Sequence, residues 1–307
     1  MGARCSPLSP NLSGRDSLAH SRRGEWIAHR HFQLAAPITI LLCCALFIAG
    51  CTAISASSTV RRIALLAPFE GRYREIGYNA LYAARLALAD YGNAAIELLA
   101  VDDGGTVETA ALHMQAVAQD PSIIAIIGLG YDAAHTLTQE AAGDLPYLIV
   151  GNWAEERAAE NVYILSSSAI NSAITIPATT AITEAAQLPA PFSGGEIIGL
   201  EGFARLREDL SEITLITSGT LPDTGFRERY ISSDLYVPEP NHLATLIYDT
   251  LNFILSAEAA NRADATNLMN VTYSGINGEI SFVDGWWASA PVYRYEYSAD
   301  GRLAPAG

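Results

Sequence analysis

Three repeats of an apolar run followed by an amphipathic segment, within residues 62–128, constrain the fold of this chain most strongly. The runs 63–67, 96–101 and 123–127 are largely aliphatic and end at proline, aspartate or glycine. Such runs are typical of strands that are buried on both faces. The segments 78–90 and 107–119 place their apolar residues at helical spacing. This alternation predicts right-handed crossovers and an α/β fold, a doubly wound parallel sheet with helices on both faces.

The remainder of the chain extends this pattern. Residues 145–150 are expected to form a fourth strand, and residues 162–165 either a fifth strand or a crossover. A helix is expected over 133–142, with His135, Gln139 and Glu140 on its polar side, and the longest helix over 241–260. Near the end, 278–282 and 292–297 are predicted to pair as a β-hairpin, because Asp284-Gly285 between them is a turn signal.

Ligands of doubly wound sheets bind beyond the carboxyl ends of the strands, so the loops after the predicted strands are the places to look for a site. These loops supply six candidate ligand-binding residues: Tyr73, Gly130, Tyr131, Asp132, Asn152 and Trp153. Asp132 could accept hydrogen bonds from an amine, and Tyr131 could stack on it. The competing interpretation is a solvated loop with a half-buried tyrosine, and Trp153 could equally cover the end of the sheet.

Composition and spacing exclude several classes of function. All 18 basic residues are arginine, which removes Schiff-base and phosphate-loop lysines. Beyond residue 50 the chain has 13 arginines against 31 acids, a balance that repels nucleic acid. Ser166–Ser168 lacks a nucleophile elbow, and Asp102-Asp103 in a glycine turn is expected to be solvated rather than to bind metal. The histidines show no ligand spacing, so we predict no catalytic residue, no metal and no cofactor.

The amino-terminal region has the layout of an export signal. A polar, arginine-containing leader precedes the apolar run 34–50, which ends in Ile48-Ala-Gly-Cys51. This ending resembles the lipobox of bacterial lipoproteins, a resemblance that implies cleavage before Cys51 and attachment of a lipid to it. An uncleaved anchor helix is the alternative, since a run of about 17 residues is barely long enough to span a bilayer. No cysteine follows Cys51, so the domain beyond it can form no disulfide.

The domain itself resembles a known family, the type I solute-binding proteins of ABC transporters in their branched-chain amino-acid group. The matching text is Ile63-Ala-Leu-Leu-Ala-Pro-Phe-Glu-Gly71, Ile96-Glu-Leu-Leu-Ala-Val-Asp-Asp-Gly-Gly105 and Asp120-Pro121 before Ile126-Ile-Gly128. Later pieces are Glu239-Pro240, Tyr248-Asp249 and the stretch 275–282. The resemblance implies two βα lobes that close over a small polar solute and deliver it to a membrane permease. In this family the turn after the third strand is rich in Ser and Thr, whereas here it carries Tyr131 and Asp132.

These observations give an expected domain plan and two hypotheses of function. The plan is a signal with lipobox (1–51), a tether (52–60), a first lobe (61–165), a reduced second lobe (166–238), and a return helix with a terminal hairpin on the first lobe (239–307). The leading hypothesis is a lipid-anchored, extracytoplasmic and non-catalytic solute-binding protein for an amino-acid-like or amine-bearing ligand. The alternative is a degenerate binding-protein domain that serves as a protein-interaction module of the envelope, which the short second lobe suggests.

Overall fold

The computed structural model describes residues 60–71, 73–154, 156–170, 180–182, 197–199, 213–264, 267–298 and 302–306. The chain divides into two compact units, Met1–Ser57 and Ser58–Gly307, and the described residues all belong to the second. The predicted signal, Cys51 and nearly all of the tether therefore lie outside the described part of the chain.

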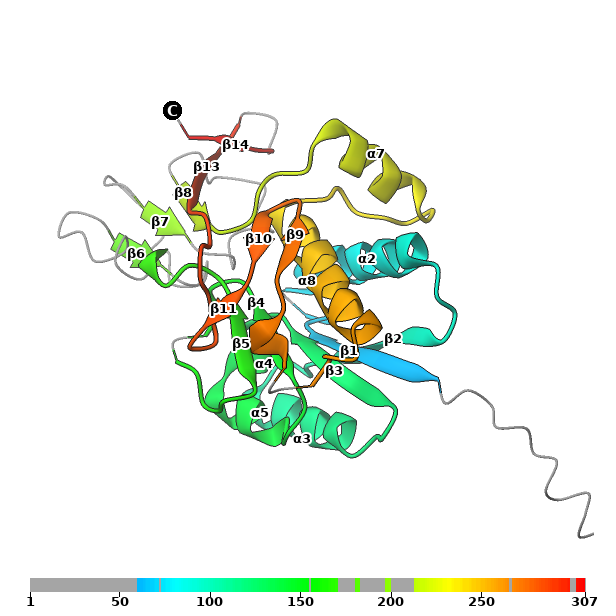
Figure 1. Cartoon of the computed structure of the whole chain (residues 1–307). Helices are drawn as coiled ribbons and strands as arrows, with labels where there is room; N and C mark the ends of the chain where they lie inside the picture. The colour runs from blue at the N-terminus through cyan, green and yellow to red at the C-terminus, as the bar shows by residue number, and fades with distance from the viewer. Residues whose placement is uncertain are drawn as a thin grey trace, which may run out of the picture. The chain divides into compact units, whose positions relative to one another are not determined.

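A mostly parallel sheet of seven strands forms the centre of the domain, in the order β11-β12-β5-β4-β3-β1-β2 (Figure 1). Strands β1 to β5 are all parallel to their neighbours. Their bounds are Arg61–Ala67, Ile96–Asp102, Ile123–Gly128, Tyr147–Val150 and Val162–Leu165. The doubly wound fold predicted from the sequence is thus confirmed, and residues 162–165 form a strand of the same sheet.

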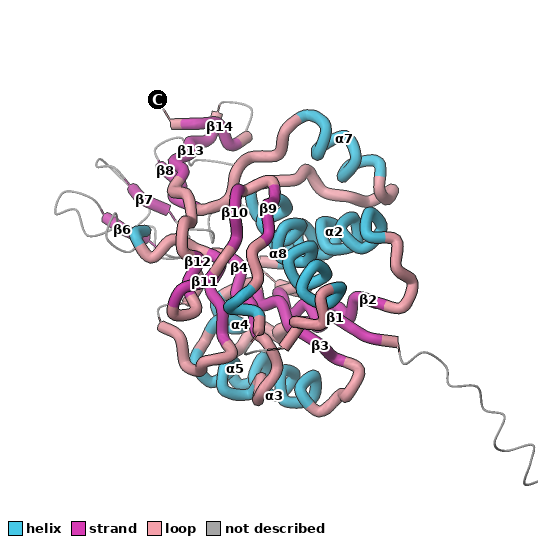
Figure 2. The backbone as a smooth tube through the Cα atoms, in the orientation of Figure 1, coloured by secondary structure: helices cyan, strands magenta, loops and turns pink. Residues whose placement is uncertain are grey.

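Helices cover both faces of this sheet, which explains why the strands are aliphatic (Figures 1 and 2). One side carries α2 and α8, which pack on each other; the other side carries α3, α4 and α5. All six residues of β3 are buried. The helices span Arg74–Tyr91 (α2), Val107–Ala118 (α3), Tyr131–Ala134 (α4), Thr136–Ala141 (α5) and His242–Ala259 (α8).

One expected helix is divided in two. His135 has an extended backbone between α4 and α5, and its imidazole caps α5 by accepting from the amide of Leu137. Gln139 is buried, not on a polar face as predicted. Its side chain donates to the carbonyls of Ala134 and Glu156, and a buried amide needs such partners.

A buried carboxylate fixes the chain that returns to this lobe. Asp249 of α8 accepts hydrogen bonds from the amides of Ile276 (3.0 Å) and Asn277 (2.7 Å) and from the Asn277 side chain (2.8 Å). These bonds hold the hairpin of β9 (Tyr273–Gly275) and β10 (Gly278–Ile280) against the helix. The approach is so close that a Cβ on Gly275 would lie 2.4 Å from the Asp249 carboxyl carbon, so glycine is required there.

The second lobe is built on a separate five-stranded sheet in the order β14-β13-β8-β7-β6. Only residues 166–223 lie between β5 and helix α7 (Thr224–Ser232), in keeping with the reduced lobe that was expected. The strands are β6 (Thr180–Ile182), β7 (Ile197–Gly199), β8 (Ile213–Thr217), β13 (Tyr293–Tyr297) and β14 (Leu303–Pro305). The chain crosses between the sheets after β5, after β8 and after β12. How the chain divides into domains within 58–307 stays a prediction.

The terminal hairpin was predicted with the wrong partner. Asp284-Gly285 does form a turn, but it joins the adjacent strands β11 (Phe282–Val283) and β12 (Trp286–Trp287). Both turn residues have positive φ, 51° and 76°, as in a two-residue hairpin. Such a turn pairs the residues that directly flank it, and not the more distant segments 278–280 and 293–297. Residues 293–297 instead pair with β8 in the second sheet, while η3 (Leu268–Asn270) packs beside β11.

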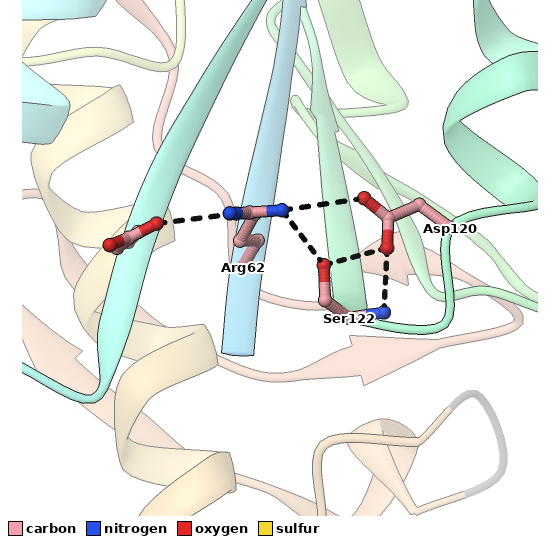
Figure 3. Close-up of polar contacts among 4 residues, drawn as sticks. Arg62, Asp120 and Ser122 are labelled. Carbon is pink, nitrogen blue, oxygen red and sulfur yellow. Dashed lines mark hydrogen bonds and ion pairs between the residues drawn. The ribbon is translucent and has the colours of Figure 1, made fainter. Parts of the chain in front are cut away.

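At the amino ends of the strands, Arg62 ties β1 to both neighbours (Figure 3). Its guanidinium donates to Glu97 of β2 (3.2 Å) and to the Ser122 hydroxyl before β3 (3.4 Å), and lies 3.6 Å from Asp120. Asp120 in turn accepts from the amide and hydroxyl of Ser122, which lowers the pKa of its carboxyl. This edge of the sheet is therefore held together by partly exposed charges.

Candidate functional site

Three aromatic rings from three loops meet at the carboxyl edge of the parallel sheet. Tyr73 follows β1, Tyr131 begins α4 after β3, and Trp153 follows β4. The Tyr131 ring lies 4.9 Å from Trp153 at 88° and 5.9 Å from Tyr73 at 62°, measured between centroids. Such edge-to-face contacts are favourable and hold the rings in place. The structure thus brings together three of the candidates that the sequence supplied from separate loops.

Gly130 shapes the loop that presents Tyr131. Its φ of 104° is open to glycine and strained for other residues. A Cβ at this position would lie 3.2 Å from Pro68 and 3.6 Å from a carboxylate oxygen of Asp103. The loops after β1, β2 and β3 therefore touch at Gly130, and a side chain there would push them apart.

Asp102, the last residue of β2, and Asp103, which follows it, have different surroundings. Asp102 accepts from the amides of Phe69 (2.7 Å), Glu70 (3.2 Å) and Gly104 (3.0 Å), so it fixes the loop that follows β1. Asp103 is only 3% exposed, which corrects the expectation that both acids are solvated. One of its oxygens accepts from the amide of Gly105 (3.0 Å).

Burial is the main reason why the pKa of Asp103 is raised to about 6. The negative charges of Asp132 and Asp102 raise this pKa further, while the Gly105 amide and His113 oppose the change. Asp132 therefore lies close enough to Asp103 for their charges to interact. A carboxylate pair of this kind beside aromatic rings favours a positively charged partner and repels an anionic one.

Tyr147 of β4 packs against the short helix α4, which carries Tyr131. Its hydroxyl donates to the carbonyl of Ala133 (2.6 Å), and burial raises the pKa of this phenol far above its usual range. The ring occupies the space over Gly128, where a Cβ would lie 2.2 Å from the hydroxyl. This hydrogen bond ties α4, and with it Tyr131, to strand β4.

The last two candidates, Asn152 and Trp153, follow β4 and have different contacts. Asn152 donates at 3.5 Å to the carbonyl of Ile216 in β8, so it connects the loop after β4 to that sheet. Trp153 is 6% exposed, and its indole donates to the carbonyl of Val150 (2.8 Å). Trp153 covers the end of β4 and also contacts Tyr131. It therefore both closes the end of the sheet, as one interpretation held, and belongs to the aromatic cluster of the candidate site, as the other held.

Sequence reasoning missed Asp103 as a member of this site. The available signal was an acid directly after a mostly aliphatic run, ahead of Gly104-Gly105. Gly104 and Gly105 have positive φ and turn the chain back over the carboxyl edge. Asp103 lies close to Gly130 and Asp132 from the loop after β3, a proximity that spacing in the sequence does not reveal.

A pocket of about 330 Å³ lies at the opposite, amino edge of the sheet. Its walls include Val60, Ser122 and Leu145, which precede β1, β3 and β4, and Asp264, which lies between α8 and η3. Solutes of parallel sheets bind at the carboxyl edge, so this pocket is not the candidate site. Among the described residues, no group of three or more His, Cys, Asp or Glu side chains could hold a metal ion, and no helix is long and apolar enough to cross a bilayer.

Comparison with known proteins identifies the fold. No family model and no curated protein matches this chain. Among solved structures, the leucine binding protein LivK of Thermotoga maritima aligns with 81% of this chain and 98% of its own, at 14% identity and a TM-score of 0.62. The substrate binding protein LivJ of Streptococcus pneumoniae, in complex with isoleucine, aligns with 80% of this chain and 97% of its own, at 15% identity and a TM-score of 0.60.

An extracellular ligand binding receptor from Desulfohalobium retbaense is similar to the same extent, with 14% identity and a TM-score of 0.62 over 80% of this chain. The chain spans only 59% of that receptor's length. At these identities the likeness concerns the fold: the chain is folded as the type I leucine/isoleucine/valine-binding proteins are, as the sequence resemblance implied.

Proposed function

We propose that this protein is an extracytoplasmic, non-catalytic solute-binding protein that captures a small amine-bearing solute at the carboxyl edge of its first lobe. The observation that carries the proposal is the cluster of Tyr73, Tyr131 and Trp153 beside Asp103 and Asp132. In this fold, ligands bind where these loops gather. A permease of the ABC type is the proposed recipient of the solute, by analogy with the solute-binding proteins that share the fold.

The chemistry of the cluster favours an ammonium group. A cation gains from the faces of aromatic rings and from carboxylates that are partly removed from water. The similar structures hold isoleucine in one case and leucine or benzoate in others. A carboxylate would meet the negative charges of Asp132 and Asp103 at this edge, so we expect the amine and not an acid group to face them.

The proposed anchor depends on the sequence alone. The apolar run 34–50 and the lipobox-like ending at Cys51 support lipid attachment, with the domain outside the cytosol. Mass spectrometry of the mature amino terminus would test this attachment. Cys51→Ala should leave the chain unlipidated and uncleaved, and a normal lipid-bearing terminus in that variant would contradict the proposal.

Binding can be tested by calorimetry with monoamines, polyamines, amino acids and simple carboxylates. We expect heat from at least one amine class and none from benzoate. Asp132→Asn and Tyr131→Leu should each weaken that binding about tenfold or more, because each removes one charged or aromatic contact of about 1–2 kcal/mol. Asp144→Asn, an exposed acid at the opposite edge, is the matched control and should bind as the unaltered chain does. Failure of every amine class at millimolar concentration would overturn the proposed function.

A further inference from the structure

The loop after α7 exposes two successive large apolar side chains. Leu235 is 82% and Tyr236 is 81% exposed, and Ile231 on the last turn of α7 is exposed beside them. We call these three residues the α7 tip. Single exposed apolar residues are ordinary, but an adjacent pair at this exposure, on a loop with a fixed shape, indicates a contact surface.

Ion pairs on α7, on the loop and on α2 fix this shape. Arg229 binds Asp90 at the end of α2, and Tyr248 of α8 donates to the same carboxylate (2.8 Å). Arg227 forms two hydrogen bonds with Glu239, and Arg85 lies 3.9 Å from Asp234. Planar two-bond arginine contacts are directional, so the loop is held on both flanks.

The same pairs offset part of the acidic charge around the α7 tip. Each of the three arginines faces an acid, while Glu228 on α7 adds a further negative charge, and the chain beyond residue 50 as a whole is strongly acidic. This pairing reduces the repulsion that an anionic surface would exert on this part of the domain, without removing it.

The α7 tip lies on the side of the domain where the chain enters. Asp90 precedes the start of β2 by a few residues, and the amide of Arg61, at the start of β1, donates to the carbonyl of Ala95 (2.9 Å). In Figure 1 the end of α7 and the start of β1 are accordingly on the same side, at the amino edge of the sheet. Eight residues separate Cys51 from Val60, so a lipid on Cys51 would keep this edge within about 30 Å of the bilayer.

We infer that the α7 tip is a membrane-contact site: Leu235 and Tyr236 insert into the headgroup region of the bilayer to which the chain is anchored. Tyrosine and leucine suit this interface, since one end of the tyrosine ring is polar and its body is apolar. This inference rests on the proposed membrane anchor and not on the identity of the solute.

The test uses the mature, lipidated chain in phosphatidylcholine vesicles, with and without phosphatidylglycerol. Cleavage before Cys51 removes Cys5, Cys43 and Cys44, and the lipid occupies Cys51, so this chain has no other thiol. One cysteine with an environment-sensitive fluorophore is introduced by Leu235→Cys or, as the matched control, by Leu137→Cys. Leu137 is also exposed (51%) but lies at the start of α5, towards the carboxyl edge. We expect a blue-shifted emission and severalfold stronger quenching by spin-labelled lipid at 235 than at 137. Adding Tyr236→Asp should abolish this difference while the chain still floats with the vesicles.

Other results would overturn the inference in distinguishable ways. Equal, weak quenching at both positions in a chain that floats would refute the membrane contact and leave the anchor and the solute site standing. A chain that does not float with the vesicles would refute the anchor as well. A fluorophore at 235 that is shielded from aqueous iodide but not quenched by lipid would mean that a protein surface covers the α7 tip instead.

Discussion

The buried carboxyl of Asp103 should lower the stability of the protein at neutral pH, and Asp103→Asn should raise it. The fold raises the pKa of Asp103 from its ordinary 3.8 to about 6, chiefly through burial, so the folded state holds this proton more tightly than the unfolded state does. The stabilisation linked to this proton is complete below pH 3.8 and is lost as the pH rises through 6. At about 1.4 kcal/mol per pH unit, the loss amounts to about 3 kcal/mol above pH 6.

Asparagine keeps the shape of the side chain and an oxygen that can accept from the Gly105 amide, but it carries no charge. We therefore expect Asp103→Asn to unfold at higher urea concentration than the unaltered protein at pH 7, by up to about 3 kcal/mol in the free energy of unfolding, and to show little difference at pH 4. Urea titrations at intervals between pH 4 and pH 8 measure this difference directly. Asp103→Ala, which loses the hydrogen bond as well, should gain less.

The reasoning would be refuted if Asp103→Asn were less stable than the unaltered protein at pH 7, or if the two proteins differed equally at every pH. The first result would mean that the Asp103 carboxylate makes an interaction that stabilises the folded state by more than the desolvation of its charge destabilises it. If the site binds an amine, the same substitution should weaken binding while it raises stability. Groups that recognise a charged ligand commonly destabilise the unliganded protein in this way.

Three further predictions concern one buried histidine, one close backbone approach and one helix cap. Burial lowers the pKa of His242 to about 3, so stability should fall as the pH drops below 6.5, by up to about 5 kcal/mol in total, and His242→Phe should lack this part of the pH profile in urea titrations. Gly275→Ala should destabilise by about 1–3 kcal/mol because its methyl group would meet Asp249, whereas Gly225→Ala, with only an ordinary contact in α7, should be neutral or slightly stabilising by the same measurement. Asp223→Ala removes the oxygen that caps α7 and should cost about 1 kcal/mol by thermal unfolding.

The sequence predicted the parallel sheet because its signal is local. Each strand from β1 to β4 is an aliphatic run long enough to be recognised by itself, and alternation with helices leaves few arrangements for such runs. The terminal strands carry no such information. Residues 293–297 alternate tyrosine with charged residues, and this pattern does not tell which sheet the strand joins. Its partner β8 was therefore not predictable from the turn signal, which fixes only the residues that immediately flank it.

The position of the candidate site could be predicted from the sequence, but the burial of one of its residues could not. Topology sends the loops after β1, β3 and β4 to one edge, so Tyr73, Tyr131 and Trp153 could be expected as neighbours. The burial of Asp103 could not be predicted, because it arises where Gly130 closes over the carboxylate. Burial is set by contacts between distant segments, and two adjacent acids in a glycine turn look the same in a sequence whether or not another loop covers them.

The two edges of the parallel sheet place the proposed anchor and the proposed solute site at opposite ends of the strands. All strands from β1 to β5 run the same way, so every loop that follows a strand is collected at one edge and the entry of the chain is fixed at the other. With the proposed lipid on Cys51, the chain would enter the domain at the amino edge, and the loops with Tyr131 and Asp132 lie at the opposite edge of the sheet. An anchor moved to the carboxyl terminus would remove this constraint, because that end of the chain leaves from the second sheet. Such a variant should keep its affinity for the solute and lose the lipid quenching at residue 235, which separates the geometry of anchoring from the chemistry of binding.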